Sequence, residues 1–223
     1  MPPTSSVPVA GVVEETVVPA KRGRKRRHDS QVERRMILDA AMVVMRRNGF
    51  AEAKITDILQ EAELSNRAFY RHFSSKDELL LGMCGRDIGF VVRQLRSRIH
   101  DAPDPVSGLH AFMDEYLRTF FEPRDPDRIA VFNSEGARRA EGYDAEVRRL
   151  DRQVIEPLLE VLRTGADLGV FRTATPERDG YAVYQLVRSL TMMPPEVRPS
   201  REDAVAYLMR FCGPALGLAP TSS

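Results

Sequence analysis

The chain has 223 residues, of which 43% are hydrophobic and 29% are charged. This composition is typical of a globular protein and excludes a chain that is disordered throughout. No run of 18 apolar residues occurs, so we expect no membrane span. Cys84 and Cys212 lie far apart, without the spacing of a disulfide framework or a zinc site, which favours a metal-free protein in the reducing cytoplasm.

The N-terminal third of the chain is basic, whereas the rest is mildly acidic. Residues 1–75 hold 13 lysines and arginines against 9 acids, and residues 76–223 hold 20 against 23. The two parts nearly cancel, so the net charge is only +1. This asymmetry predicts a polyanionic partner for the N-terminal part alone.

The first 29 residues are predicted to form a disordered tail that ends in a basic arm. Residues 1–20 contain four prolines and no helical period, and residues 21–27 carry six basic groups in seven positions. The basic residues follow the weakly apolar stretch 7–13 instead of preceding it, so we expect no secretory signal. Two interpretations of the arm stay open: a solvated tail, or a segment that lies in the minor groove or along phosphates.

The pattern of residues 30–75 predicts a domain of three helices. In the first, Ile37, Ala41 and Val44 recur at spacings of four and three, as on one face of an amphipathic helix, and Gly49 lies just past its end. Ser65 is placed to cap the third helix. The predicted helices cover residues 31–48, 55–62 and 65–72.

The second and third helices are separated by Glu63 and Leu64 alone. So short a link makes two helices cross steeply, which is the helix-turn-helix arrangement. In that arrangement the second helix presents its outer side to the major groove. The outer side here carries side chains that can hydrogen-bond to phosphates or base edges: Asn66, Arg67, Tyr70 and Arg71.

From residue 76 onward the pattern stays helical, with prolines and glycines between the segments. We therefore predict an all-α chain in which residues 76–223 form a second, larger helical domain. The expected helices cover residues 76–100, 105–121, 127–140, 144–168, 177–193 and 201–216.

The stretch 33–80 resembles the DNA-binding domain of the TetR family of transcriptional repressors. It reads ERRMILDAAMVVMRRNGFAEAKITDILQEAELSNRAFYRHFSSKDELL, and the element FYRHFSSK is specific for so short a motif. Family members usually have Gly where this chain has Glu63, so a left-handed backbone is expected at that residue. Beyond residue 80 the chain matches the family only in length and helical character.

The resemblance implies a role for each matching residue of the N-terminal domain. These roles are base contacts by Asn66 and Arg67, phosphate contacts by Tyr70, His72 and Lys76, a backbone or base contact by Thr56, and capping of the recognition helix by Ser65. Arg67 replaces the small residue of many members and adds a side chain that can pair bidentately with guanine.

For the C-terminal domain the resemblance implies a ligand cavity and a two-fold dimer. Methionine side chains are flexible and polarisable, so a cavity lined by methionine and aromatic residues suits an apolar or amphipathic effector. The candidate cavity residues are Met83, Phe90, Phe112, Met113, Tyr116, Phe120 and Phe132. The candidate dimer residues are Tyr181, Tyr184, Val205, Leu208 and Phe211. Ordinary core packing is the alternative for both sets.

No catalytic or cofactor motif is present, neither G-x-S-x-G nor a P-loop nor G-x-G-x-x-G nor H-E-x-x-H. The acidic pair Asp114–Glu115 is interpreted as solvated charge on a helix. Two alternatives stay open: an all-helical enzyme, and an adaptor whose helix-turn-helix contacts protein instead of DNA. The favoured interpretation is a metal-free, cytoplasmic, homodimeric repressor that binds an operator and a small effector. The sequence names neither the effector nor the operator.

Overall fold

A computed structural model describes residues 29–172, 174–194 and 196–218. Within these ranges the regular structure is helical, which confirms the predicted all-α class. The helices are α1 Ser30–Glu52, α2 Ile55–Glu61, α3 Asn66–Phe69, α4 Lys76–His100, α5 Pro105–Phe121, α6 Pro126–Asn133, α7 Glu135–Arg138, α8 Tyr143–Asp167, α9 Pro176–Thr191 and α10 Arg201–Ala215. The predicted tail and basic arm lie outside the described residues, apart from Asp29, which caps α1.

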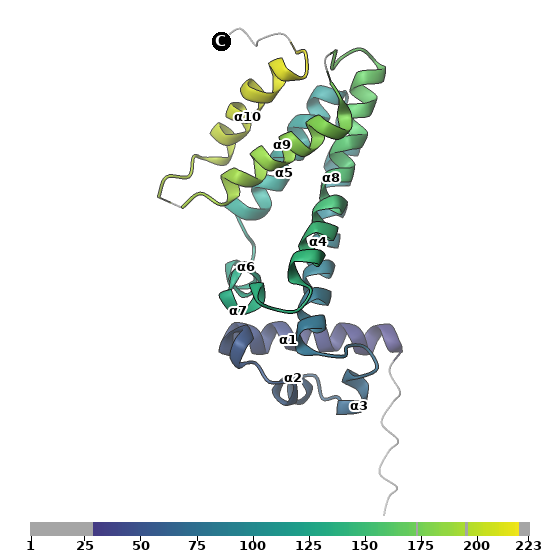
Figure 1. The fold of residues 1–223 in the computed structure, drawn as a ribbon, viewed down its shortest axis with the longest axis vertical. Coiled ribbons are helices and arrows are strands. Elements are labelled where there is room, and N and C mark those ends of the chain that lie inside the picture. Colours follow the sequence, from purple (N-terminus) through teal and green to yellow (C-terminus); the bar gives the residue numbers. More distant parts are fainter. Residues whose placement is uncertain (1–28, 173, 195, 219–223) are drawn as a thin grey trace, which may run out of the picture.

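The N-terminal helices lie together at one end of the molecule (Figure 1). Gly49 adopts a left-handed φ of 79° inside α1, so the helix breaks where the sequence predicts and then resumes to Glu52. The predicted third helix is too long, because α3 ends at Phe69 and the chain then turns. That turn brings Phe73 into the core, with its ring centroid 5.8 Å from that of Phe69.

One helix predicted over residues 127–140 is in fact two. The backbone of Ser134 is extended, with ψ at 150°, and this residue separates α6 from α7. Its hydroxyl oxygen accepts a hydrogen bond from the backbone N–H of Ala137 at 3.3 Å, which caps the second piece. The apolar spacing continues across Ser134, so the hydrophobic pattern does not show this break.

Two hydrophobic clusters form the core, and α4 contributes to both. The first joins α1, α2 and the residues around α3 to the start of α4, where Leu79 and Leu80 are buried, and to α6 and α7. The second joins the rest of α4 to α5, α8, α9 and α10. In Figure 1, α4 rises from the N-terminal helices and runs alongside α8. It therefore connects the two parts of the molecule directly.

Ion pairs link α1 to the rest of the chain. Arg86 of α4 donates to Asp39 of α1 at 2.6 Å. Arg46 of α1 contacts Asp125 at 3.2 Å and Asp127 at 3.0 Å, at the start of α6. Within the described ranges, no helix combines the length and apolar character that crossing a bilayer requires.

Candidate nucleic-acid interface and internal cavity

Helix α3 has one buried and one exposed side. Phe69 is fully buried, whereas Asn66 and Arg67 are exposed and Tyr70 is 62% exposed. The hydroxyl oxygen of Ser65 accepts from the backbone N–H of Ala68 at 3.4 Å, which is the predicted cap. In Figure 1, α2 and α3 lie on the side of α1 that faces away from the C-terminal helices. The predicted contact residues Asn66, Arg67 and Tyr70 are thus exposed to solvent, and their contact with DNA stays a prediction.

The turn before α3 has the left-handed residue that the family resemblance implies. Glu63 adopts a left-handed φ of 53°, which an L-residue with a long side chain holds at a modest cost. Thr56 is exposed on α2, and its hydroxyl donates to Asp57 Oδ1 at 3.2 Å. The two helices therefore place Thr56 and the α3 side chains on the surface of the same small domain.

A buried carboxylate holds the turn that follows α3, and the sequence interpretation missed it. Glu33 is 7% exposed; its Oε2 accepts from Arg71 Nη2 at 2.8 Å and lies 3.3 Å from His72 Nε2. Its position four residues before Ile37, on the apolar side of α1, was a signal in the sequence. The contact to phosphate or base edge predicted for Arg71 and the phosphate contact predicted for His72 stay predictions, and the His72 side chain is only 6% exposed in this structure.

Lys76 takes part in a contact that the sequence did not indicate. Its ammonium group donates to three backbone carbonyls at the end of α1: those of Phe50 and Ala51 at 2.8 Å and that of Ala53 at 3.0 Å. It also lies 4.7 Å from the centroid of the Phe50 ring. An ammonium group has three N–H donors, and all three have acceptors here. The phosphate contact predicted for Lys76 stays a prediction that competes with this arrangement.

The start of α4 is fixed by a reciprocal cap. Ser75 Oγ accepts from the backbone N–H of Glu78 at 3.0 Å. The Glu78 carboxylate accepts from the hydroxyl of Ser74 at 2.6 Å and from its backbone N–H at 2.7 Å. These two hydrogen bonds, the hydroxyl first, lower the pKa of Glu78 below its ordinary value. The serines of the FYRHFSSK element thus orient the helix that leaves the N-terminal domain.

A cavity of about 630 Å³ lies between α4, α5, α6, α8 and α9. Four of the predicted cavity residues line it: Phe90, Tyr116, Phe120 and Phe132. Three others do not. Met83 is fully buried in the N-terminal cluster, and Phe112 and Met113 are fully buried in the C-terminal cluster. Apolar spacing marks the buried side of a helix, but it does not separate packed core from cavity wall.

One wall of the cavity carries a chain of polar groups. The hydroxyl of Tyr116 on α5 lies 3.5 Å from the hydroxyl of Tyr184 on α9, which donates to Asp151 Oδ1 on α8 at 2.6 Å. Arg188 Nη1 donates to Asp151 Oδ2 at 2.8 Å. Burial raises the pKa of Tyr116 to about 12 and raises that of Tyr184 as well. Both phenols are therefore hydrogen-bond donors at neutral pH.

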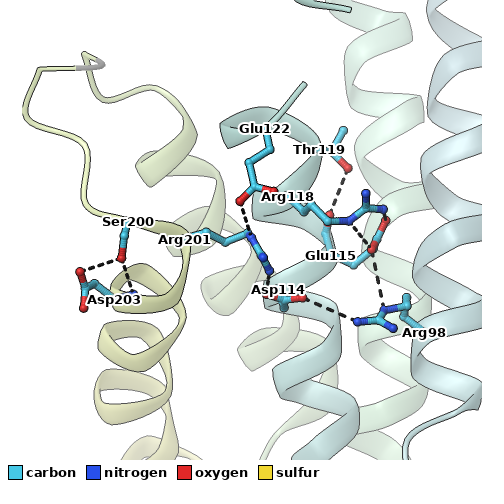
Figure 2. A network of polar contacts seen from close by, with 9 residues as sticks. All are labelled: Arg98, Asp114, Glu115, Arg118, Thr119, Glu122, Ser200, Arg201 and Asp203. Atoms are coloured by element: carbon cyan, nitrogen blue, oxygen red, sulfur yellow. Dashed lines mark hydrogen bonds and ion pairs between the residues drawn. The ribbon is translucent and has the colours of Figure 1, made fainter. Parts of the chain in front are cut away.

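Polar contacts also tie α10 to α5 (Figure 2), and several α5 residues line the cavity. Arg201, at the start of α10, donates to Glu122 at 2.8 Å and to Asp114. Glu115 is 2% exposed and accepts two hydrogen bonds from Arg118, at 2.9 and 2.5 Å. The interpretation of Asp114–Glu115 as solvated charge was therefore wrong, because Glu115 is buried and Asp114 pairs with Arg201 of α10. The hydrogen bonds to the Glu115 carboxylate raise the pKa of Arg118 above its ordinary value.

The thiol of Cys84 also lines the cavity. Burial, reinforced by the nearby carboxylates of Asp87 and Glu146, raises its pKa to about 12. Because the thiolate is the reactive form, a raised pKa lowers the reactivity expected of this thiol. No group of three or more metal-ligating side chains is found in the part of the chain that the structure describes.

The predicted dimer residues divide into two groups. Tyr181 is 46% exposed on α9 and Phe211 is 57% exposed on α10, whereas Tyr184, Val205 and Leu208 are buried in the chain's own core. These three therefore cannot contact a partner surface in this conformation. Tyr207, which the sequence interpretation left out, is 45% exposed and stacks on Phe211 with ring centroids 6.1 Å apart. Tyr207 lies four residues before Phe211, one helical turn away, so both side chains are on the outer side of α10.

Residues 37–83 match the sequence model of the family described as bacterial regulatory proteins, tetR family. Over 79 residues the chain is 32% identical to the uncharacterised HTH-type transcriptional regulator YvdT of Bacillus subtilis (strain 168). That alignment covers 35% of this chain and only 41% of YvdT.

Solved structures share the fold over most of the chain. One, from Pseudomonas aeruginosa PAO1 and proposed to be a transcriptional regulator, has a TM-score of 0.69 at 21% identity and covers 86% of this chain and 93% of its own. Another is AibR in complex with isovaleryl coenzyme A and operator DNA, with a TM-score of 0.57 at 18% identity, covering 84% and 100%. The helix-turn-helix domain of this chain is therefore similar to that of the tetR family of bacterial regulatory proteins, and the fold beyond it is shared with solved structures.

Proposed function

We propose that this protein is a ligand-responsive transcriptional repressor that binds a palindromic operator as a homodimer. The observation that carries this proposal is the exposed side of α3 within a tetR-family domain, where Asn66, Arg67 and Tyr70 are free of the chain's own core. Arg67 forms no ion pair with a described residue, so its guanidinium is available to base edges. Tyr70 is available to a phosphate oxygen.

The outer sides of α9 and α10 support the dimer. Tyr181, Tyr207 and Phe211 are large apolar side chains that are about half exposed in the single chain. Burying them against a second copy would remove this apolar surface from water, which favours association. A two-fold dimer would place two α3 helices on successive half-sites about one helical turn apart, or a multiple of it.

The cavity between α4 and α9 supports the effector part of the proposal. Its size and its aromatic wall suit a small apolar or amphipathic molecule. AibR, which shares the fold, is described with isovaleryl coenzyme A bound. In this chain Asp39, Arg86 and Asp125 belong both to the cavity wall and to the ion pairs that reach α1.

Effector binding would act by favouring a dimer in which the two α3 helices are wrongly spaced for the operator. The ion pairs Arg86–Asp39 and Arg46–Asp125 offer the path, since they connect the cavity wall to the first helix of the DNA-binding domain. A hundredfold fall in operator affinity requires about 2.7 kcal/mol of coupling between the two sites.

The test is a selection of genomic DNA fragments from the source organism with the purified full-length chain. We expect enrichment of palindromic sites, and we expect sedimentation to give the mass of a dimer. The variant Phe211→Glu should lower both dimer content and operator affinity, while Tyr143→Phe, in the cavity wall away from α10, should leave both unchanged. A monomer that enriches no sequence over random competitor at moderate salt would refute the proposal.

A further inference from the structure

The cavity wall has seven carboxylates, and each is already neutralised by an ion pair. Four are paired with arginines that also line the cavity, as in Asp87–Arg128 and Asp151–Arg188, and three are paired with Arg46, Arg149 and Arg201, outside it. A charged group entering this space would meet no uncompensated opposite charge along most of the wall. Two lining arginines, Arg93 and Arg124, have no carboxylate partner among the described residues, and both are exposed.

The Asp151–Arg188 pair differs from the other pairs because buried phenols support it. Tyr184 is 2% exposed and donates to Asp151 Oδ1, and Tyr116 lies behind it. The side chains of the pair keep 23% and 31% of their surface accessible, and both line the cavity. The pair therefore offers carboxylate lone pairs and guanidinium N–H groups side by side, with no net charge.

Apolar side chains line the same cavity as this pair, and the polar Thr191 on α9 lines it too. Val154 lies one turn after Asp151 on α8, and Phe120 lies on α5 with its ring centroid 5.0 Å from that of Tyr116. A polar ligand group placed among these side chains would lose its hydration and would have to regain hydrogen bonds from the pair. A group that both donates and accepts satisfies both members, whereas a full charge is attracted by one and repelled by the other.

We propose that Asp151 and Arg188 form a subsite that anchors a neutral donor–acceptor group, such as a hydroxyl, at the end of an otherwise apolar ligand. This inference rests on the proposed effector role of the cavity and adds the chemical class of the ligand. Tyr116 and Tyr184 are positioning residues, because Tyr184 donates to Asp151 Oδ1 and Tyr116 in turn contacts Tyr184.

The test compares four probes that share an eight-carbon chain: 1-octanol, octanoate, octylammonium and octanoyl coenzyme A. Calorimetric titration of the full-length protein should give the highest affinity for 1-octanol, by tenfold or more over the other three. Preference for octanoate or octanoyl coenzyme A would overturn the proposal, and so would equal affinities or no binding of any probe. Operator selection with the same protein sample is independent of this outcome, so failure of the subsite and failure of the regulator proposal are distinguishable.

Two charge-removing variants make the test specific to the subsite. Asp151→Asn leaves Arg188 uncompensated and should shift the preference to octanoate. Arg188→Gln leaves Asp151 uncompensated and should shift it to octylammonium. If Asp151 and Arg188 acted in folding alone, the variants would bind all four probes more weakly, and the order of the affinities would not change.

A milder variant keeps the proposal testable if either of these fails to fold. Tyr184→Phe removes only the hydroxyl that donates to Asp151, and it should move the preference toward octylammonium by a smaller factor. Tyr143→Phe is the matched control, because its hydroxyl also lies on the cavity wall but donates to the carbonyl of Phe132 at 3.2 Å. The assignment would be overturned if the order of probe affinities changed in Tyr143→Phe. The order would also have to stay the same in the Asp151, Arg188 and Tyr184 variants.

Discussion

Glu33 in the first turn of α1 binds Arg71 in the turn that follows α3, with 2.8 Å between Glu33 Oε2 and Arg71 Nη2. The contact joins two segments that are 38 residues apart in the sequence. The Glu33 side chain is 9% exposed, whereas that of Arg71 is 45% exposed. The buried carboxylate thus anchors the turn after α3 from within, while the Arg71 guanidinium remains accessible on the surface.

We predict that Glu33→Gln lowers the free energy of unfolding by about 1–2 kcal/mol. A hydrogen bond between charged groups contributes roughly 1.5–3 kcal/mol, and the exposure of Arg71 reduces that figure. Urea denaturation measures the loss. Glu61→Gln is the control, because Glu61 pairs with Arg47 on the surface, where both side chains are well exposed, and should cost under about 1 kcal/mol. Equal losses in the two variants would contradict the buried role of Glu33.

We predict that Arg67→Ala weakens operator binding by about 1–3 kcal/mol and relaxes the preference at one base position. Arg67 is exposed on α3 and has no ion pair with a described residue, so its fork of donors can meet a guanine edge. Titrations against operators altered one position at a time measure both effects. Equal losses on every sequence would place Arg67 on a phosphate instead.

Tyr70→Phe provides the contrast to Arg67→Ala. The ring stays packed edge-on against Phe69, with centroids 5.3 Å apart, so only the hydroxyl is lost. We predict weaker binding to every sequence alike, because a phosphate contact carries no sequence information. A changed base preference would show that Tyr70 contacts a base.

The sequence predicted the N-terminal helices well because their signals are local. The apolar period of α1, the break at Gly49 and the Ser65 cap depend on neighbours within one or two turns, whereas the left-handed Glu63 was expected from the family resemblance. The contacts of Glu33 and Lys76 were not predicted, because their partners lie 23 to 39 residues away. Spacing in a sequence gives the side of a helix, but it does not identify the group across from it.

The same limit explains the mixed result for the C-terminal domain. Tyr181 and Tyr184 are one turn apart on α9, yet one is 46% exposed and the other is 2% exposed. An apolar residue can face the chain's own core, a cavity or a second copy, and the hydrophobic pattern is alike for all three. Asp151 and Arg188 were missed for a related reason, since a surface charge and a charge in a cavity wall have the same sequence signature.

We predict that Lys76→Met lowers the free energy of unfolding by about 1–3 kcal/mol, because three carbonyls at the end of α1 lose their donor. Lys54→Met removes a nearby exposed charge and should have little effect on stability. The salt dependence of operator binding tests the phosphate role. A log–log slope that falls by about 0.9 in Lys76→Met alone would assign the ammonium to a phosphate as well. An unchanged slope would leave the α1 carbonyls as its sole partners.

The two cysteine thiols make the stability of the fold depend on pH in the alkaline range. Burial raises the pKa of the Cys84 thiol from 9.0 to about 12 and that of Cys212 to about 11, so the folded chain keeps protons that the unfolded chain releases. Where the folded state binds more protons, the free energy of unfolding falls as pH rises. The contribution of Cys84 is therefore complete below pH 9 and is lost progressively between pH 9 and 12.

The Cys84 contribution is measurable as a difference between the parent chain and Cys84→Ala. Urea denaturation at pH 8, 9, 10 and 11 should give a steeper fall for the parent chain, with the difference bounded at about 1.4 kcal/mol per pH unit. The lost methyl-sized volume in Cys84→Ala shifts the whole curve and does not alter its slope. Alkylation by iodoacetamide at pH 8 should likewise be slow in the folded chain and fast after unfolding. Parallel stability curves, or rapid alkylation of the folded protein at pH 8, would mean that the thiol titrates near its ordinary value.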